Sequence, residues 1–304
     1  MSRAASVGAL AALASIALLA GCGGGGTPVS SARDRFDAHR AFRDLRAQVR
    51  IGPRPAGSKA NEEEVRFIVR RLREAGIRGA FVQRPYRNVV ALIPGRAPGT
   101  VVVGAHHDTK DIPGFVGAND GASGVAVLLE LARDLPRPLN GPSVDLVFFD
   151  AEEARDDRPF DVDGARGSRQ FIRYARRGGR QASPHLSEIR AMVLFDLVAD
   201  CDLGIPREAN SDERLYDLFA RAASDRSSSD SAAPFVGSAP GVLDDHTPFL
   251  GAGIPAVDLI DFDFGPGPTP GAWWHTRQDN LRHVCARSLD AVGAPALAAV
   301  QAIR

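Results

Sequence analysis

Apolar residues follow two different spacings along this chain. In residues 31–51, Phe36, Phe42, Leu45 and Val49 recur mostly at helical spacing between Arg and Asp residues, which predicts an amphipathic helix. Short apolar runs bounded by Pro, Gly or polar residues predict strands instead. The same criteria predict helices at 60–76, 121–135, 167–177, 211–223 and 286–303, and strands at 88–95, 100–106, 143–150, 191–198 and 254–261.

Local signals mark where several of these elements begin and end. Helix 60–76 has acidic residues in its first turn and ends at Gly76, while Ser211 is the expected N-cap of helix 211–223. A Pro-Gly turn separates strands 88–95 and 100–106. Because apolar strands alternate with helices, the pattern predicts one α/β domain with a mostly parallel sheet covered on both faces.

The N-terminus has the features of an export signal. Arg3 precedes the apolar stretch from Val7 to Ala20, so residues 1–21 are predicted to be a signal peptide outside the fold. Leu19-Ala20-Gly21-Cys22 resembles the bacterial lipobox, which implies lipidation of Cys22 and anchoring to a bacterial membrane, at the cell surface or on the periplasmic side. The alternative is an ordinary signal peptide with a chance Cys. Residues 22–33 would form a flexible tether, and 34–304 the folded domain.

Charge and cysteine content bear on the binding partners of the protein and on disulfide formation. The 304 residues have a formal net charge of zero, so no general attraction to nucleic acid is expected. Besides Cys22 the chain holds Cys201 and Cys285, which an oxidising compartment would allow to form a disulfide. Two separate buried thiols are an equally good interpretation.

Acidic and His residues recur at or after the predicted strand ends. A buried carboxylate costs free energy unless a positive group meets it. In open α/β sheets the site lies outside the carboxyl ends of the strands, where such side chains would converge. A set of nitrogen and oxygen ligands there suits zinc. The residues concerned are His106, Asp108, Asp120, Glu152, Glu153, Asp196 and His275.

Several acidic and His residues at these strand ends also have a simpler interpretation than metal binding. Asp120 would cap the helix that follows it, and Asp196 would be a hydrogen-bonded core carboxylate. His107 would point away from His106 and is expected to be a solvated neighbour. Asp108, two residues after His106 and on the same face, would orient that imidazole without binding metal.

The order of motifs along the chain resembles that of zinc aminopeptidases of metallopeptidase family 28 and the related glutaminyl cyclases. The resemblance extends from residue 34 to about residue 300, and it implies a three-layer α/β/α sandwich with a central, mostly parallel mixed sheet. Any single motif is weak, whereas the full set is specific. The motifs are "GPRPAGS", "GAHHDT", "GANDGASG", "FFDAEEA", "GSRQF", "FDLV", "DDHTPFLGAGIPA" and "WHTRQDN".

The resemblance also implies roles for individual residues. Matched motif by motif, Asp120, Glu153 and His275 are zinc ligands, and Glu152 is the general acid/base. In the aminopeptidase branch, His106 and Asp196 hold a second zinc and Asp120 bridges the two ions. In the cyclase branch there is one zinc, and Asp196 holds the α-amino group of an N-terminal Gln. The substrate in either branch is the N-terminus of a peptide or protein.

Three features favour the cyclase. A long insertion separates Glu153 from Gly167, and Trp274 directly precedes His275, where it would wall a small dry pocket. One of Trp273 and Trp274 is expected to pack in the core. Asp244 matches a cyclase carboxylate that hydrogen-bonds to the acid/base.

Two features favour the aminopeptidase. "GANDGASG" is closer to the aminopeptidase form, and Phe160 is the only aromatic residue of the insertion, where animal cyclases carry Trp. A third class of function is a lipid-tethered binding protein with an inactive site. The intact set of matched ligands and Glu152 argues against it. The prediction is therefore a cyclase, with the aminopeptidase as the alternative.

Overall fold

The computed structural model of the protein describes residues 36–156, 158–226 and 234–304. Its centre is a six-stranded sheet with the order β1-β2-β4-β3-β5-β8. Strands β4, β3, β5 and β8 run parallel, and β1 and β2 add an antiparallel edge. The strands are β1 Phe81–Val82, β2 Val89–Ile93, β3 Thr100–His106, β4 Ser143–Phe149, β5 Ile189–Asp196 and β8 Ala256–Ile260.

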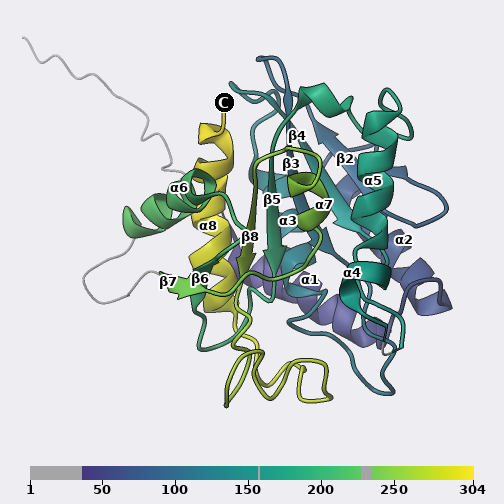
Figure 1. Ribbon diagram of the computed structural model, residues 1–304, viewed down its shortest axis with the longest axis vertical. Helices are drawn as coiled ribbons and strands as arrows, with labels where there is room; N and C mark the ends of the chain where they lie inside the picture. The colour runs from purple at the N-terminus through teal and green to yellow at the C-terminus, as the bar shows by residue number, and fades with distance from the viewer. Residues whose placement is uncertain (1–35, 157, 227–233) are drawn as a thin grey trace, which may run out of the picture. The chain divides into compact units, whose positions relative to one another are not determined.

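Helices cover both faces of this sheet (Figure 1). Alternate strand residues pack on opposite sides: Val101 and Val103 contact the core under α1, α2, α3, α6 and α8, whereas Val102 contacts the core under α5 and α7. The predicted three-layer α/β/α architecture is thereby confirmed. The helices are α1 Ala38–Ile51, α2 Lys59–Glu74, α3 Ser123–Asp134, α4 Phe160–Asp163, α5 Arg166–Arg176, α6 Glu213–Ser224, α7 Thr247–Leu250 and α8 Ala286–Ala302, with a 3-10 turn at Leu186–Glu188.

The structure adds elements that the sequence patterns did not predict. Strands β6 Ile205–Glu208 and β7 Phe235–Ala239 form a separate two-stranded sheet, and α4 and α7 are single helical turns. Strand β4 inserts between β2 and β3, which are neighbours in the chain but not in the sheet. These features depend on long-range pairing, which local periodicity does not encode.

The predicted N-cap of α6 was wrong by one residue. Asp212, not Ser211, caps the helix, and its carboxylate accepts hydrogen bonds from the N–H groups of Arg214 and Leu215. The Ser211 hydroxyl instead accepts a 2.8 Å hydrogen bond from the backbone N–H of Asp258 in β8. Because the Ser211 hydroxyl is engaged by β8, the neighbouring Asp212 caps the helix.

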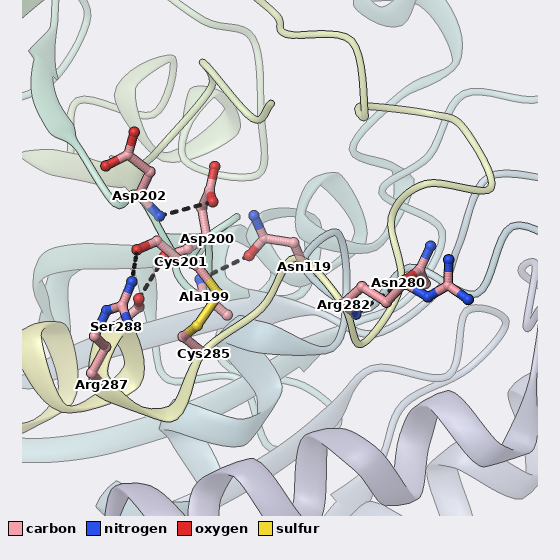
Figure 2. The surroundings of a disulfide bond; sticks show 10 residues. All are labelled: Asn119, Ala199, Asp200, Cys201, Asp202, Asn280, Arg282, Cys285, Arg287 and Ser288. Atoms are coloured by element: carbon pink, nitrogen blue, oxygen red, sulfur yellow. Dashed lines mark hydrogen bonds between the residues drawn. A yellow bond between two sulfur atoms is a disulfide. The ribbon is translucent and has the colours of Figure 1, made fainter. Parts of the chain in front are cut away.

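Cys201 and Cys285 form a disulfide, which resolves the question left open by the sequence (Figure 2). It ties the segment after β5 to the start of α8, across 84 residues of sequence. Beside it, the backbone N–H of Ala199 donates a 2.8 Å hydrogen bond to the Asn119 side chain. The disulfide thus braces a segment that contacts the residue next to Asp120.

The predicted signal peptide, Cys22 and the tether lie outside the described residues. Among the helices of the described part, none is long and apolar enough to cross a membrane.

Candidate metal centre and active site

Parallel strand ends bring the predicted residues to one edge of the sheet. His106 is the last residue of β3, Asp196 is the last of β5, and Glu152 and Glu153 follow β4 by a few residues. Because β4, β3 and β5 are adjacent and parallel, their carboxyl ends meet at the same place. All four side chains are largely buried there.

The first group of donor atoms consists of Asp120, Glu153 and His275. The Nε2 atom of His275 lies 3.2 Å from Oε1 of Glu153 and 3.4 Å from Oδ2 of Asp120. Ligands about 2.0–2.1 Å from a tetrahedral zinc ion are roughly 3.3 Å apart. The buried Oδ2 atom of Asp120 has no hydrogen-bond partner among the described residues. Spacing and chemistry of this group therefore fit a zinc ion.

The second group shares Asp120 with the first. Its members are His106, Asp120 and Asp196, and the Nε2 atom of His106 lies 3.2 Å from Oδ1 of Asp120 and 3.1 Å from Oδ1 of Asp196. Each oxygen of Asp120 therefore faces a different imidazole. This arrangement has the donors for a second ion, with Asp120 between the two.

Asp120 does not cap α3. The N-cap of α3 is Ala122, and no side chain caps that helix. Asp120 is instead positioned through its backbone, because its N–H and that of Asn119 donate hydrogen bonds of 3.0 and 2.7 Å to the two oxygens of Asp279. No sequence motif predicts a role for Asp279, and its only signal is its place in "WHTRQDN".

Strained backbone occurs at three points of the site. Ala151, Leu197 and His275 all have positive φ values, of 58°, 49° and 53°, which residues other than glycine rarely adopt. Ala151 precedes Glu152, and Leu197 follows Asp196. Such conformations persist only where the surrounding structure enforces them, and they concentrate at functional sites.

Glu152 lies beside the donor groups without belonging to either. Its backbone N–H donates a 3.0 Å hydrogen bond to Oδ1 of Asp108, and its Oε2 atom is 4.0 Å from Nδ1 of His106. Burial raises the pKa of Glu152 well above its ordinary value, the nearby His106 opposes this, and Glu153 adds to it. A carboxyl group in this setting is suited to hold and release a proton.

Asp108 contacts Glu152 more closely than it contacts His106. Its Oδ1 atom lies 3.8 Å from Nδ1 of His106, which is longer than a hydrogen bond. Asp108 therefore holds the backbone of the Glu152 segment, while its charge also faces the imidazole.

The two imidazoles are held among carboxylates. Burial alone would lower the pKa of His106 and of His275. The surrounding carboxylates together outweigh it, chiefly Asp196 for His106 and Glu153 for His275, and both pKa values are raised. Burial would likewise raise the pKa of Asp120, yet its contacts with the two His residues lower it. Asp120 is thus kept as a carboxylate anion, which can bind a cation.

The expectation that His107 is solvated was wrong. Its side chain is fully buried, with Nδ1 3.5 Å from the Asn61 amide and Nε2 3.4 Å from the carbonyl oxygen of Arg87. Asn61 belongs to α2, which covers His107 at this strand end, so the residue is interior.

The donor groups open into a cavity of about 410 Å³. Trp274 lines it and stacks on His275, with ring centroids 3.7 Å apart and an 18° angle between the ring planes. Phe160, from the insertion, lines it too. Trp273 instead stacks on His283 and packs against Phe264, so one Trp of the pair is structural.

Asp244 also lines this cavity, together with Lys110. Burial raises the pKa of Asp244 well above its ordinary value, and the neighbouring Asp258, Asp196 and Glu152 carboxylates raise it further. The charge of Glu152 acts on Asp244, but these two described side chains share no direct hydrogen bond. Lys110 places its Nζ atom 3.9 Å from Glu153 and was not singled out by sequence.

The described fold and site match known proteins. The family model named "Peptidase family M28" matches residues 88–300. The chain belongs to peptidase family M28. That membership and the donor set identify a zinc-dependent enzyme.

Relatives of both branches resemble this M28 chain. A glutaminyl cyclase structure from an Acidobacteriales bacterium has a TM-score of 0.78 and 31% identity, covering 91% of this chain and 98% of that one. The glutaminyl-peptide cyclotransferase of Gloydius blomhoffii is 30% identical over 252 residues, which span 68% of this chain and 62% of the relative. Aminopeptidase YwaD of Bacillus subtilis is 28% identical over 234 residues, which span 73% of this chain and 45% of the relative.

Proposed function

We propose that the protein is a glutaminyl-peptide cyclotransferase that converts an N-terminal Gln to pyroglutamate and releases ammonia. The observation that carries this proposal is the stacking of Trp274 on His275, which walls the donor groups into a cavity of about 410 Å³. That space has room for a glutamine side chain folded toward its own α-amino group. The likeness to the Acidobacteriales glutaminyl cyclase supports the same assignment.

Asp120, Glu153 and His275 would hold the zinc ion, which when bound supplies positive charge that polarises the γ-carbonyl of the substrate. Glu152 takes a proton from the α-amino group as its nitrogen attacks the carbonyl carbon of the side-chain amide. The same carboxyl returns the proton to the departing amide nitrogen, which leaves as ammonia. Asp196, at the cavity wall, holds the α-amino group in position. Trp274 keeps water from the reacting atoms.

A co-catalytic zinc aminopeptidase is the second candidate. The group formed by His106, Asp120 and Asp196 favours it, because two donor groups that share one carboxylate could hold two ions. In that case Glu152 would deprotonate a water molecule, which attacks the first peptide bond.

One assay separates the two candidates. Zinc-loaded protein is incubated with a Gln-peptide and, separately, with leucine p-nitroanilide, and metal content is measured alongside. Ammonia release and a pyroglutamyl product, without p-nitroaniline, are expected for the cyclase. Release of p-nitroaniline by a protein with two zinc ions would overturn the cyclase assignment.

We also propose that the enzyme is exported and lipid-anchored through Cys22. The Leu19–Cys22 sequence supports this, and the Cys201–Cys285 disulfide is typical of an oxidising compartment. Cys22→Ser should shift the protein from the membrane fraction to the soluble fraction. Unchanged partitioning of the variant would contradict the anchor.

A further inference from the structure

A second cavity, of about 340 Å³, adjoins the cavity that holds the donor groups. We call it the side chamber. The two cavities share lining residues and are therefore adjacent. The residues that line both are Phe160, Val242, Leu243, Ile260, Phe262 and Trp274.

The side chamber is mainly apolar beyond the shared wall as well. Pro206, Ala239 and Pro240 line it, and its charged lining residues are Glu208 and Asp263. Among the described residues that line it, none carries a positive charge. The active-site cavity differs, because Lys110 lines it. The chamber therefore suits an apolar group and disfavours an anion.

The wall between the cavities is held in place by the small sheet. The Glu208 carboxylate accepts a 3.1 Å hydrogen bond from the backbone N–H of Val242, and the Asn210 amide donates one of 2.9 Å to the Val242 carbonyl oxygen. A side chain at Gly241 would come within 2.5 Å of the Asn210 amide and would displace it from this contact. Trp274 meets Phe262 edge-on, with ring centroids 5.3 Å apart. The chamber is therefore formed before any ligand arrives.

The geometry of ring closure indicates which part of the substrate faces the side chamber. Ring closure brings the α-amino group of the first residue against the carbonyl carbon of its own side-chain amide, so both lie at the donor groups beside Glu152. The remaining exit from the first residue is its carbonyl carbon, which continues into the second residue. Trp274 and Leu243, which line both cavities, form a wall along which that residue can continue toward the side chamber.

Resting on the proposed function, we infer that the side chamber binds the side chain of the second substrate residue and selects apolar and aromatic side chains. The preferred substrates are peptides that begin with Gln followed by Phe, Leu or a similar residue. Peptides with Asp or Glu at the second position are poor substrates, because the chamber offers Glu208 and Asp263 and no cation.

The first test compares Gln-Phe-Ala, Gln-Gly-Ala and Gln-Asp-Ala as substrates of the wild-type enzyme. The kcat/KM for Gln-Phe-Ala should exceed that for Gln-Gly-Ala by roughly 10- to 100-fold, as expected for burial of an aromatic side chain in an apolar pocket. Gln-Asp-Ala should fall below Gln-Gly-Ala. Equal values for all three would overturn the inference and leave the cyclase assignment intact, whereas absence of ammonia from every Gln-peptide would overturn the proposed function.

A pair of variants tests whether the preference for the second residue arises in the side chamber. Ala239 lines the side chamber but not the active-site cavity, and Val236 lies on the same strand, 60% exposed and outside both. Ala239→Phe should fill the chamber and bring the Phe-to-Gly ratio of kcat/KM close to one. Val236→Phe should keep the wild-type ratio. An unchanged ratio in Ala239→Phe would place the preference elsewhere.

Binding without turnover supplies an independent readout. Zinc-loaded Glu152→Gln protein is titrated by calorimetry with Gln-Phe-Ala and Gln-Gly-Ala, which it should bind without converting. The Kd for the Phe peptide should be lower by about tenfold or more. Equal Kd values would overturn the side chamber as a binding site even if the enzyme proved not to be a cyclase.

Discussion

The backbone N–H of Asp120 donates a 3.0 Å hydrogen bond to Asp279, which lies 159 residues further along the chain. The second oxygen of Asp279 accepts from Asn119 at 2.7 Å, so one carboxylate holds two consecutive residues. Asp120 belongs to both donor groups, and its orientation depends on this support. Asp279 is therefore a positioning residue for the metal centre.

Replacing Asp279 should weaken zinc binding without removing a ligand. We expect Asp279→Ala to raise the Kd for zinc by about 10- to 100-fold, the usual effect of losing a group that orients a ligand. Competition with a chromophoric chelator measures this directly. Asp217→Ala, which removes only an exposed pair with Arg221 on α6, is the control and should bind zinc normally. A wild-type Kd in Asp279→Ala would show that Asp120 needs no such support.

The two imidazoles should contribute differently to metal content. His275→Ala removes a ligand from the group that also contains Glu153, and we expect it to lose zinc and activity together. His106 is a member of the second group only, so His106→Ala removes no ligand from the first. If the enzyme is a one-zinc cyclase, this variant should keep one zinc per chain in elemental analysis. Loss of one of two bound ions in His106→Ala would instead indicate the aminopeptidase arrangement.

Glu152→Gln should separate chemistry from binding. The substitution keeps the size and polarity of the side chain but removes its ability to carry the proton, so turnover should fall by about 100-fold or more. Zinc content should stay at the wild-type level, because Glu152 belongs to neither donor group. Near-normal turnover in the zinc-loaded variant would rule out its acid/base role.

The disulfide should contribute substantially to stability. Closing an 84-residue separation restricts the unfolded chain, and we expect Cys201→Ser with Cys285→Ser to lower the free energy of unfolding by about 2–5 kcal/mol. Denaturant titration with and without reductant measures this. Reductant should have no effect on the double variant, and an equal response of both proteins would mean that the disulfide is not the cause.

Asp145 should make stability depend on pH. Burial in β4 raises the pKa of Asp145 to about 7 in the folded state, against an ordinary value of 3.8. Between these pH values the unfolded chain releases this proton and the folded chain keeps it. The contribution of Asp145 therefore favours folding most below pH 3.8, declines as the pH rises toward about 7, and is level above that.

Asp145→Asn removes this titration and should be the more stable protein at pH 8, by about 1–3 kcal/mol, with the difference shrinking toward pH 4. Chemical unfolding of both proteins at several pH values measures the difference. A gap that does not change with pH would contradict the assignment of the shift to this carboxyl.

Much of the architecture could be predicted because it depends on local pattern. The apolar run that ends at His106 and the one before Asp150 predicted buried parallel strands, and the structure has β3 and β4 there. Parallel strands place their carboxyl ends together, so the sequence pattern already located the site at that edge. Motif order then supplied the family and the identity of the donor residues.

Other features depended on contacts between distant parts of the chain. Nothing in the local sequence places β4 between β2 and β3, buries His107 under α2, or brings Asp279 to the backbone of Asp120. The same holds for the side chamber, whose walls come from β6, β7 and the segment around Phe262.

The physical reason is the range over which each interaction acts. Side-chain periodicity is decided within a few residues, so the sequence alone determined where the longer helices and most strands of the central sheet lie. Strand order, cavity shape and support of a ligand arise from packing and hydrogen bonds that form only when the chain has folded back on itself. The tertiary structure alone therefore decided how Asp120 is held and which space lies beside Trp274.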